Sequence, residues 1–353
     1  MMARWFGWLW VAFLVSVPLW VKDQYFLHVL IMTGIFTIAA MSLNLLLGYT
    51  GQLSLGHVAF FGIGAYTSAL VSLGFDLQIT NDHVFVFDPK PVWIGLISGI
   101  AVAGFFGWVI GKISFKVRGA YFVIVTISFA EVMRLVALNW VDLTQGPMAL
   151  TSIPPLTLQI PGVWELTFWR KTPNYYLMLF LAVVSFITIR RLVHSRIGRA
   201  LVALRENETL ATSVGVDVTR YLVLAAVVSA AIAGAAGGVY SHYVRIIDPD
   251  VFLFIYTVTM VIMVITGGKG TLSGPIVGGL IFGIAPEMLR ELAQPEIQWI
   301  IYGALMVAIV FFLPDGIVPA LGSWWRNHFA DPGSRQPPGT AADGDAQAAR
   351  AVK

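Results

Sequence analysis

The stretch Asn44-Leu-Leu-Leu-Gly48-Tyr-Thr-Gly51-Gln-Leu-Ser-Leu-Gly-His57 decides the fold class, because it interrupts two long apolar runs with glycines and polar side chains. Its glycines, from Gly48 onward, break the helix that the first apolar run predicts. In a membrane, lipid cannot satisfy the backbone groups that a helix break frees, so the break needs a protein-lined or water-filled surrounding. We therefore predict a pathway through the protein here, bordered by Asn44, Gly48, Gly51, Gln52, Ser54 and His57.

The composition indicates a polytopic membrane protein. Of the 353 residues, 58% are hydrophobic and only 12% are charged, whereas soluble domains carry about 25% charged residues. The chain has no cysteine, which excludes disulfides, cysteine-ligated zinc and a thiol nucleophile. Apolar runs of about 20 residues recur along the chain. We expect an all-α fold of about ten transmembrane helices, near 5–21, 25–47, 53–73, 92–111, 119–138, 174–193, 220–240, 254–267, 272–290 and 298–313.

The segments between these spans give the orientation and the domain boundaries. Most lysines and arginines fall on one side when the number of spans is even and both termini are cytoplasmic, as the positive-inside rule requires. No small-residue cleavage site follows the first apolar run, so residues 1–24 are interpreted as a retained first helix. The membrane domain is 25–318, with a long outer loop at 139–173 and a charged inner loop at 194–219. The Gly-, Pro-, Ala- and Asp-rich residues 319–353 predict a disordered cytoplasmic tail.

A second segment repeats the pattern of the first break. The stretch Gly267-Gly-Lys-Gly270-Thr-Leu-Ser273 shares Gly-x-x-Gly-x-Leu-Ser with residues 48–54, and both lie between apolar runs. A duplicated helix-break element, as in many transporters, is one interpretation. Chance similarity in a glycine-rich chain is the other. On the first interpretation Gly267, Gly270 and Ser273 also border the pathway.

The inner loop predicts a short amphipathic helix from 199 to 214. Leu201, Leu204, Ala211 and Val214 form an apolar strip, charged residues cover the rest, and Gly215 can end the helix. Such a helix suits either docking into a groove of a soluble partner or lying on the lipid surface.

Two polar features inside the spans have more than one interpretation. Glu131 and Arg134 lie three residues apart, on one helix face, where each charge alone would cost about 2.5–3.5 kcal/mol near the bilayer centre. They are either a pathway or gate element, or a structural ion pair near the outer end of the helix. His57 is either a proton carrier or a hydrogen-bonded packing residue.

The chain shows no site for catalysis. The segment Gly268-Lys269-Gly270-Thr271 is not a phosphate-binding loop, because that motif needs Ser or Thr directly after the lysine and glycine where Met263 stands. The sequence shows no metal-ligand cluster and no catalytic triad. We predict a transporter without enzymatic activity, driven by an ion gradient or by another subunit.

Residues 44–57 resemble the signature of the branched-chain amino acid permeases of bacterial ABC importers, the LivH/LivM class. The resemblance extends through 196–216, Thr266–Pro275 and Leu313–Ile317, covers about 25–318, and is nearer to the LivM-type subunit than to LivH. Two departures stand out. Thr212-Ser213 replaces an expected alanine and acidic residue in the element Ala211-x-x-x-Gly215, and Ala149 replaces an expected glycine in the outer loop.

The resemblance implies a multi-pass bacterial inner-membrane protein that takes branched-chain or other apolar amino acids from a periplasmic binding protein. A LivH-type second permease would pair with this chain, and two cytoplasmic ATPases would bind ATP and Mg, so that this chain holds no cofactor and contacts no nucleic acid. Two alternatives stay open: a urea or amide permease of the same class, and a stand-alone gradient-driven transporter. The inner loop corresponds to the family's coupling loop, which favours docking to an ATPase and assigns that contact to Arg199, Leu204, Arg205, Glu206, Glu208, Ala211 and Gly215.

Overall fold

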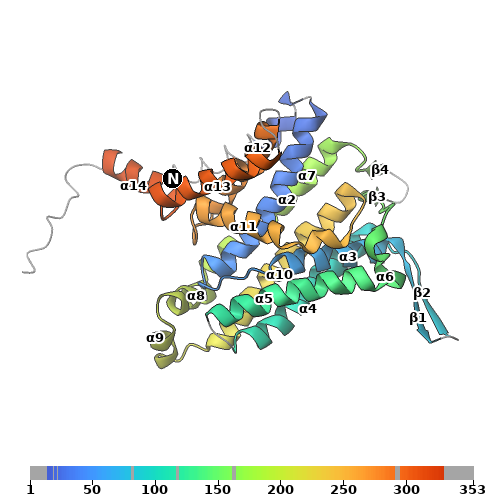
Figure 1. Cartoon of the computed structure of the whole chain (residues 1–353), viewed down its shortest axis with the longest axis horizontal. Coiled ribbons are helices and arrows are strands. Elements are labelled where there is room, and N and C mark those ends of the chain that lie inside the picture. The colour runs from blue at the N-terminus through green and yellow to red at the C-terminus, as the bar shows by residue number, and fades with distance from the viewer. Residues whose placement is uncertain are drawn as a thin grey trace, which may run out of the picture.

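The computed structural model describes residues 14–18, 20–21, 23–80, 83–116, 119–160, 164–290 and 295–329, and most of them are helical (Figure 1). The predicted spans from the second to the tenth each coincide with a helix, while the first lies largely outside the described residues. These helices are α2 (Gln24–Leu47), α3 (Val58–Leu73), α4 (Val92–Ser114), α5 (Ala120–Asn139), α7 (Lys171–Val193), α10 (Val218–Val244), α11 (Phe254–Gly267), α12 (Gly274–Arg290) and α13 (Pro295–Phe312).

Helices α2, α4, α5, α7 and α10 are long and apolar enough to cross a membrane, while α3, α11 and α12 are apolar but shorter. The described chain is therefore a multi-pass helical membrane protein. The number of ten spans stays a prediction.

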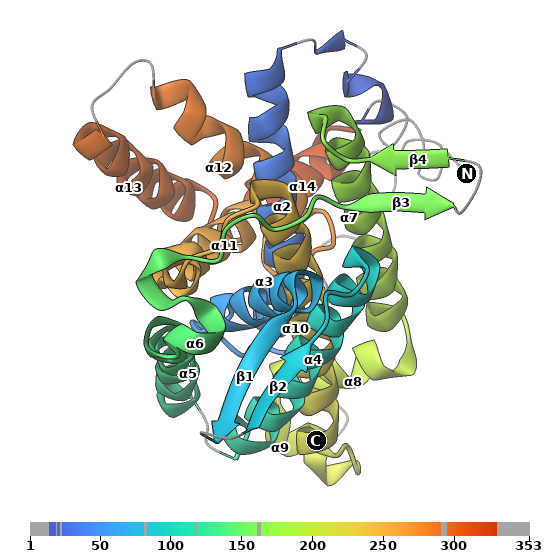
Figure 2. The same cartoon turned by 90° about the vertical axis from the view of Figure 1, so that its right-hand side faces the viewer.

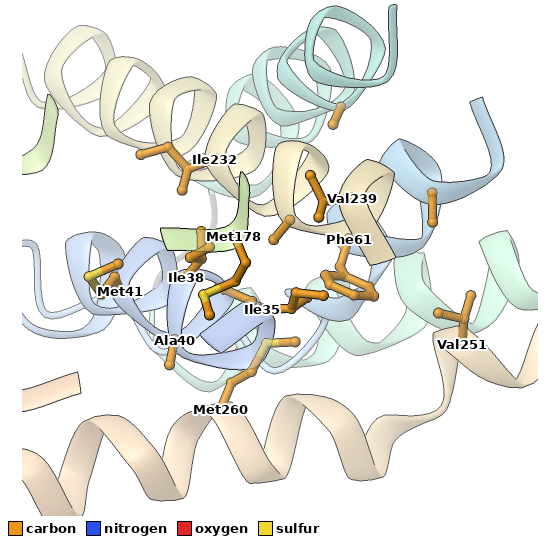
Figure 3. Packing of buried hydrophobic residues seen from close by; sticks show 14 of the residues in the cluster. Ile35, Ile38, Ala40, Met41, Phe61, Met178, Ile232, Val239, Val251 and Met260 are labelled. Atoms are coloured by element: carbon orange, nitrogen blue, oxygen red, sulfur yellow. The ribbon is translucent and has the colours of Figure 1, made fainter. Parts of the chain in front are cut away.

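The core is centred on α2 and α10, the two most enclosed spans. Ile35 and Ile38 of α2 are fully buried, in one cluster with Phe61 of α3 and Met260 of α11 (Figure 3). Helices α3, α4 and α10 approach one another through small residues: a Cβ on Gly64 would lie only 2.3 Å from the Cα of Gly234. Without water between helices, such close backbone contact is a main source of stability in membranes.

The two ends of the bundle differ. One end carries two β-hairpins and the short helices α6 (Val141–Thr144) and η1 (Gly146–Met148), and the opposite end carries α8 (Arg196–Glu206) and α9 (Glu208–Ser213) (Figures 1 and 2). The hairpins pair β1 (Phe75–Thr80) with β2 (His83–Phe87), and β3 (Thr157–Ile160) with β4 (Trp164–Thr167), both antiparallel. The outer loop 139–173 and the inner loop 194–219 thus lie at opposite ends.

Two predictions need correction. The fold is not purely α-helical, because segments such as Phe75–Thr80, where apolar Phe75 and Leu77 alternate with polar residues, form hairpins outside the spans. The predicted tail is also too long: Ile317–Phe329 forms helix α14, which packs against α11 and α12. Apolar residues such as Leu321 and Trp324 give this segment its helical pattern, and residues 330–353 lie outside the described part.

The outer loop contains a strained alanine. Ala149 adopts φ 64° and ψ 148°, a region that strongly favours glycine, and it is buried. The next residue, Leu150, exchanges two backbone hydrogen bonds with Ile247, at 2.8 and 3.0 Å, and these bonds hold Ala149 in place. This is the position where the family resemblance leads one to expect glycine.

We predict that Ala149→Gly stabilises the protein by about 1 kcal/mol. Relief of strain on the order of 1–3 kcal/mol outweighs the roughly 0.4–1 kcal/mol that glycine costs through the unfolded chain. The measurement is thermal unfolding in detergent. Ala137→Gly, at a buried helical position of α5, is the control and should lower the unfolding temperature; a fall in both variants would contradict the strain argument.

Candidate functional site

The two helix breaks lie against each other and are joined by one buried side chain. Asn44, in the last turn of α2 and only 2% exposed, donates from Nδ2 to the carbonyl of Thr271 at 2.8 Å. Its Oδ1 accepts from the backbone N–H of Gly270 at 2.9 Å. A single amide thus satisfies both a donor and an acceptor that the second break frees, which is what the membrane environment demands.

Glycines let the breaks come this close. A Cβ on Gly48 would lie 2.2 Å from Oδ1 of Asn44 and 2.3 Å from the nitrogen of Gly270. Gly51 and Gly270, which are the matching positions of the two Gly-x-x-Gly-x-Leu-Ser segments, both have φ of 74°. The two breaks therefore share a local backbone feature as well as a sequence pattern, while their origin by duplication stays a prediction.

Arg205 of α8 connects the inner loop to this junction. Its Nη1 donates to the carbonyl of Gly48 at 2.7 Å, and its Nε and Nη2 bind the carboxylate of Glu206. A Cβ on Gly51 would lie 3.1 Å from the Cγ of Arg205, so a side chain there would press on the arginine stem. Burial raises the pKa of Tyr49 to about 12, with Arg205 acting in the opposite direction, so this phenol stays neutral.

The inner loop forms two helices, and the prediction of one continuous helix over 199–214 is wrong. Asn207 adopts an extended conformation between α8 and α9, and its side chain accepts from the N–H of Leu210 as the N-cap of α9. Gly215, with φ 89°, ends α9 as predicted, and the N–H of Val216 donates a hydrogen bond to the carbonyl of Ala211.

Most residues of the predicted apolar strip are buried against other helices of this protein. Leu201, Leu204 and Ala211 are buried in a cluster with Leu45 and Leu46 of α2. The exposed apolar residues of the inner loop are instead Leu210, 64% exposed, and Val214, 75% exposed, together with the exposed Arg199, Glu206 and Thr209. The sequence pattern could not distinguish the buried apolar residues from the exposed ones, because the apolar strip runs over two helices of different direction.

His57 lies inside the bundle, and its alternative roles as proton carrier or packing residue stay predictions. It is fully buried, and its Nε2 lies 2.8 Å from Oγ of Ser42 in α2. Ser229 of α10 in turn donates to the carbonyl of Ser42, and Thr257 of α11 accepts from the N–H of Val58. The first break is thus held by α2, α10 and α11 through hydroxyl groups.

The other predicted pathway residues differ in exposure. Ser54 is buried, Gln52 is partly exposed, Ser273 is exposed, and Gly267 packs on the backbone of Gly274. Sequence reasoning did not assign Gly316 to the site, yet a Cβ there would lie 2.4 Å from the Cα of Gly268. The signal was the Pro314-Asp-Gly316 turn, whose glycine has φ 88°.

A hollow of about 430 Å³ lies at the opposite end, between α2, α7 and α10. Lys171 and Arg245 give it a positive character, and the guanidinium of Arg245 lies 4.1 Å from the ring centre of Trp169. The sequence did not indicate this hollow, because its lining comes from separate spans. Within the described residues, no three His, Asp or Glu side chains gather in a group that could hold a metal.

Comparison with known proteins gives the family. The family described as "Branched-chain amino acid transport system / permease component" matches residues 25–310. The chain belongs to this permease family. It is 31% identical over 307 residues to the branched-chain amino acid transport permease LivM of Salmonella typhimurium, covering 82% of this chain and 68% of that protein.

Two further relatives extend the comparison. The Escherichia coli LivM is 30% identical over 331 residues, which are 88% of this chain and 74% of LivM. The Salmonella typhimurium LivH permease is 25% identical over 301 residues, which are 80% of this chain and 91% of LivH. No solved structure matches this chain. The greater identity to LivM agrees with the LivM-type resemblance of the sequence.

We predict that Asn44→Leu, which keeps the approximate volume, destabilises the protein by about 1–3 kcal/mol for each backbone group that loses its partner. Those groups are the N–H of Gly270 and the carbonyl of Thr271. Unfolding in detergent measures the loss. Asn139→Leu is the control, because its amide also donates to a backbone carbonyl but is exposed; equal losses in both variants would show that the junction contributes nothing special.

Proposed function

We propose that this chain is the LivM-type permease subunit of an ABC importer that moves branched-chain or other apolar amino acids into the cytoplasm. The observation that carries the mechanism is the bond from Arg205 to Gly48, which ties the inner loop to the breaks. The proposed substrate class rests on the relatives, which are branched-chain amino acid transport permeases, and on the low charge of the spans.

The structure suggests how a partner's motion reaches the breaks. Leu210 and Val214 of α9 offer an exposed apolar contact for an ATPase, and Leu201 and Leu204 of α8 pack on the end of α2. A displacement of α8 and α9 would therefore move α2, and Asn44 would carry the movement into the second break. The predicted coupling residues Arg199, Leu204, Arg205, Glu206, Glu208, Ala211 and Gly215 all lie on or directly beside these two helices.

The two ends of the bundle suggest where the remaining parts of the assembly bind. We assign the hairpin end to the periplasm, where the binding protein docks, and the α8–α9 end to the cytoplasm, where two ATPases hold ATP and Mg. Both termini are then cytoplasmic, ten helices cross the bacterial inner membrane, and a LivH-type permease completes the pair. The opposite locations of the loops 139–173 and 194–219 support this orientation.

Reconstitution tests the function. The chain is placed in proteoliposomes with a LivH-type permease, two ATPases and a binding protein of the same class, and uptake of radiolabelled leucine, alanine and urea is measured with ATP inside. We expect ATP-dependent uptake of leucine. Leucine uptake by this chain without any ATPase, or ATP-dependent uptake of urea alone, would overturn the proposal.

We predict that Arg205→Gln lowers uptake at least tenfold while ATP hydrolysis by the complex persists. Loss of one charge-assisted hydrogen bond is worth about 1.5–3 kcal/mol, or roughly tenfold to more than a hundredfold. The comparison of uptake with ATP hydrolysis measures the loss of coupling. Arg191→Gln, at an exposed position at the end of α7, is the control; a normal ratio of uptake to hydrolysis in Arg205→Gln would refute the connection.

We also predict that Gly215→Val weakens ATPase binding and uptake but leaves membrane insertion intact. Its φ of 89° costs an L-residue about 1–2 kcal/mol, and no atom lies within 4 Å of the new Cβ, so the effect comes from the backbone alone. Gly215→Asn is the matched control, since asparagine tolerates this conformation. Co-purification of the ATPases with each variant measures binding, and equal recovery would contradict the docking assignment.

A further inference from the structure

The exposed face of α5 differs from the exposed faces of its neighbours. On α4, Ile94, Ile97, Ala101, Phe105 and Trp108 follow one another at helical spacing, and no charged residue appears before the last turn. The exposed residues of α7 between its first and last turns are also uncharged. Wholly apolar faces of this kind are what lipid contact requires.

The face of α5 is interrupted by polar groups at successive turns. Ser128, Glu131 and Asn139 are exposed there, among the exposed apolar residues Val132 and Leu135. The Glu131 side chain is 51% exposed, and Glu131 lies eight residues, or about 12 Å, before the end of the helix. Helix α5 lies at the edge of the bundle, where no other described helix covers this face (Figures 1 and 2).

The side chain of Arg134 points toward the N-terminus of α5 and away from its nearer, C-terminal end. Side chains on a helix lean toward its N-terminus, and the guanidinium of Arg134 binds Glu131, one turn earlier, through Nε at 3.0 and 3.1 Å and Nη2 at 2.8 Å. The arginine therefore does not reach for the membrane surface, as an arginine in contact with lipid would. The pair needs water or protein around it at this depth.

Glu131 and Arg134 also have polar atoms that can form hydrogen bonds to a ligand. The hydrogen bonds within the pair engage Nε and Nη2 of Arg134, so Nη1 can donate elsewhere, and the carboxylate of Glu131 can accept further bonds. Asp250, exposed on the short helix η2 (Pro249–Phe252) that packs against α5, lies within electrostatic reach of Arg134. One cation and one carboxylate thus lie on a face of α5 whose remaining exposed side chains are largely apolar, and a second carboxylate lies on the neighbouring helix η2.

From this arrangement we propose that the face of α5 bearing Ser128, Glu131 and Arg134 lines the water-filled path of the substrate. Arg134 meets the carboxylate of a dipolar amino acid, and Glu131, with Asp250 nearby, meets its ammonium group. Val132 and Leu135 offer contact for an apolar side chain. The assignment of the ligand rests on the proposed function, whereas the assignment of the path rests on the exposed charges alone.

Cysteine accessibility tests the path, because the chain has no cysteine of its own. Ser128→Cys on α5 and Ala101→Cys on α4 are compared in the assembled complex in membranes, using a charged, membrane-impermeant maleimide. We expect at least tenfold faster labelling at position 128. Equal rates would overturn the path, and this outcome does not depend on which substrate is transported or on whether transport occurs.

Protection and charge exchange test the ligand. Leucine-loaded binding protein should slow labelling of Ser128→Cys, and Glu131→Gln and Arg134→Gln should each raise the KM for leucine uptake about tenfold. The exchange variant Glu131→Arg with Arg134→Glu keeps an ion pair but exchanges the positions of its positive and negative charges. Full uptake by the exchange variant would show that the pair is only structural, and absence of protection by leucine would overturn the ligand assignment.

Discussion

The buried amide of Asn44 is the interaction on which the rest of this structure depends. Two helix breaks far apart in sequence free backbone groups, and those beside the buried Asn44 must find partners within the protein. Asn44 supplies a donor to Thr271 and an acceptor to Gly270, so each break completes the other. Glycines are needed at the contact for the same reason, because any side chain at Gly48 would occupy the position of the amide.

The need of freed backbone groups for hydrogen-bond partners also explains why the inner loop contacts the end of α2. Arg205 adds a third contact. It donates a hydrogen bond to the carbonyl of Gly48, which has no helical partner because α2 ends there. The leucines of α8 then pack on the last turns of α2, so polar and apolar contacts act on the same helix end. A helix terminus, a loop and a second break form one connected unit, which is what transmission of force between subunits requires.

Much of this arrangement could be predicted from the sequence, and the failures have identifiable causes. The breaks were predictable because glycine and polar residues between apolar runs have one physical meaning in a membrane. The partner of Asn44 was not, because no local pattern reveals a contact to Gly270. The turn at Asn207 was missed although Asn before Glu208 is a good N-cap, since an unbroken stripe of apolar residues favoured one helix. The hairpins were not predicted, because strands of four to six residues are too short for their periodicity to identify them.

The first helix break contacts α5, the helix that bears Glu131 and Arg134. A Cβ on Gly56, in the first break, would lie 1.7 Å from the carbonyl oxygen of Thr126, so the break touches the backbone of α5. Thr126 precedes the exposed Ser128 by two residues, and α5 otherwise packs chiefly on η2 and α3. A loosely packed helix responds to a push more readily than one in the core. On the proposed mechanism, a displacement that α2 passes to the break would therefore also shift α5, and so would change the position of Glu131 and Arg134.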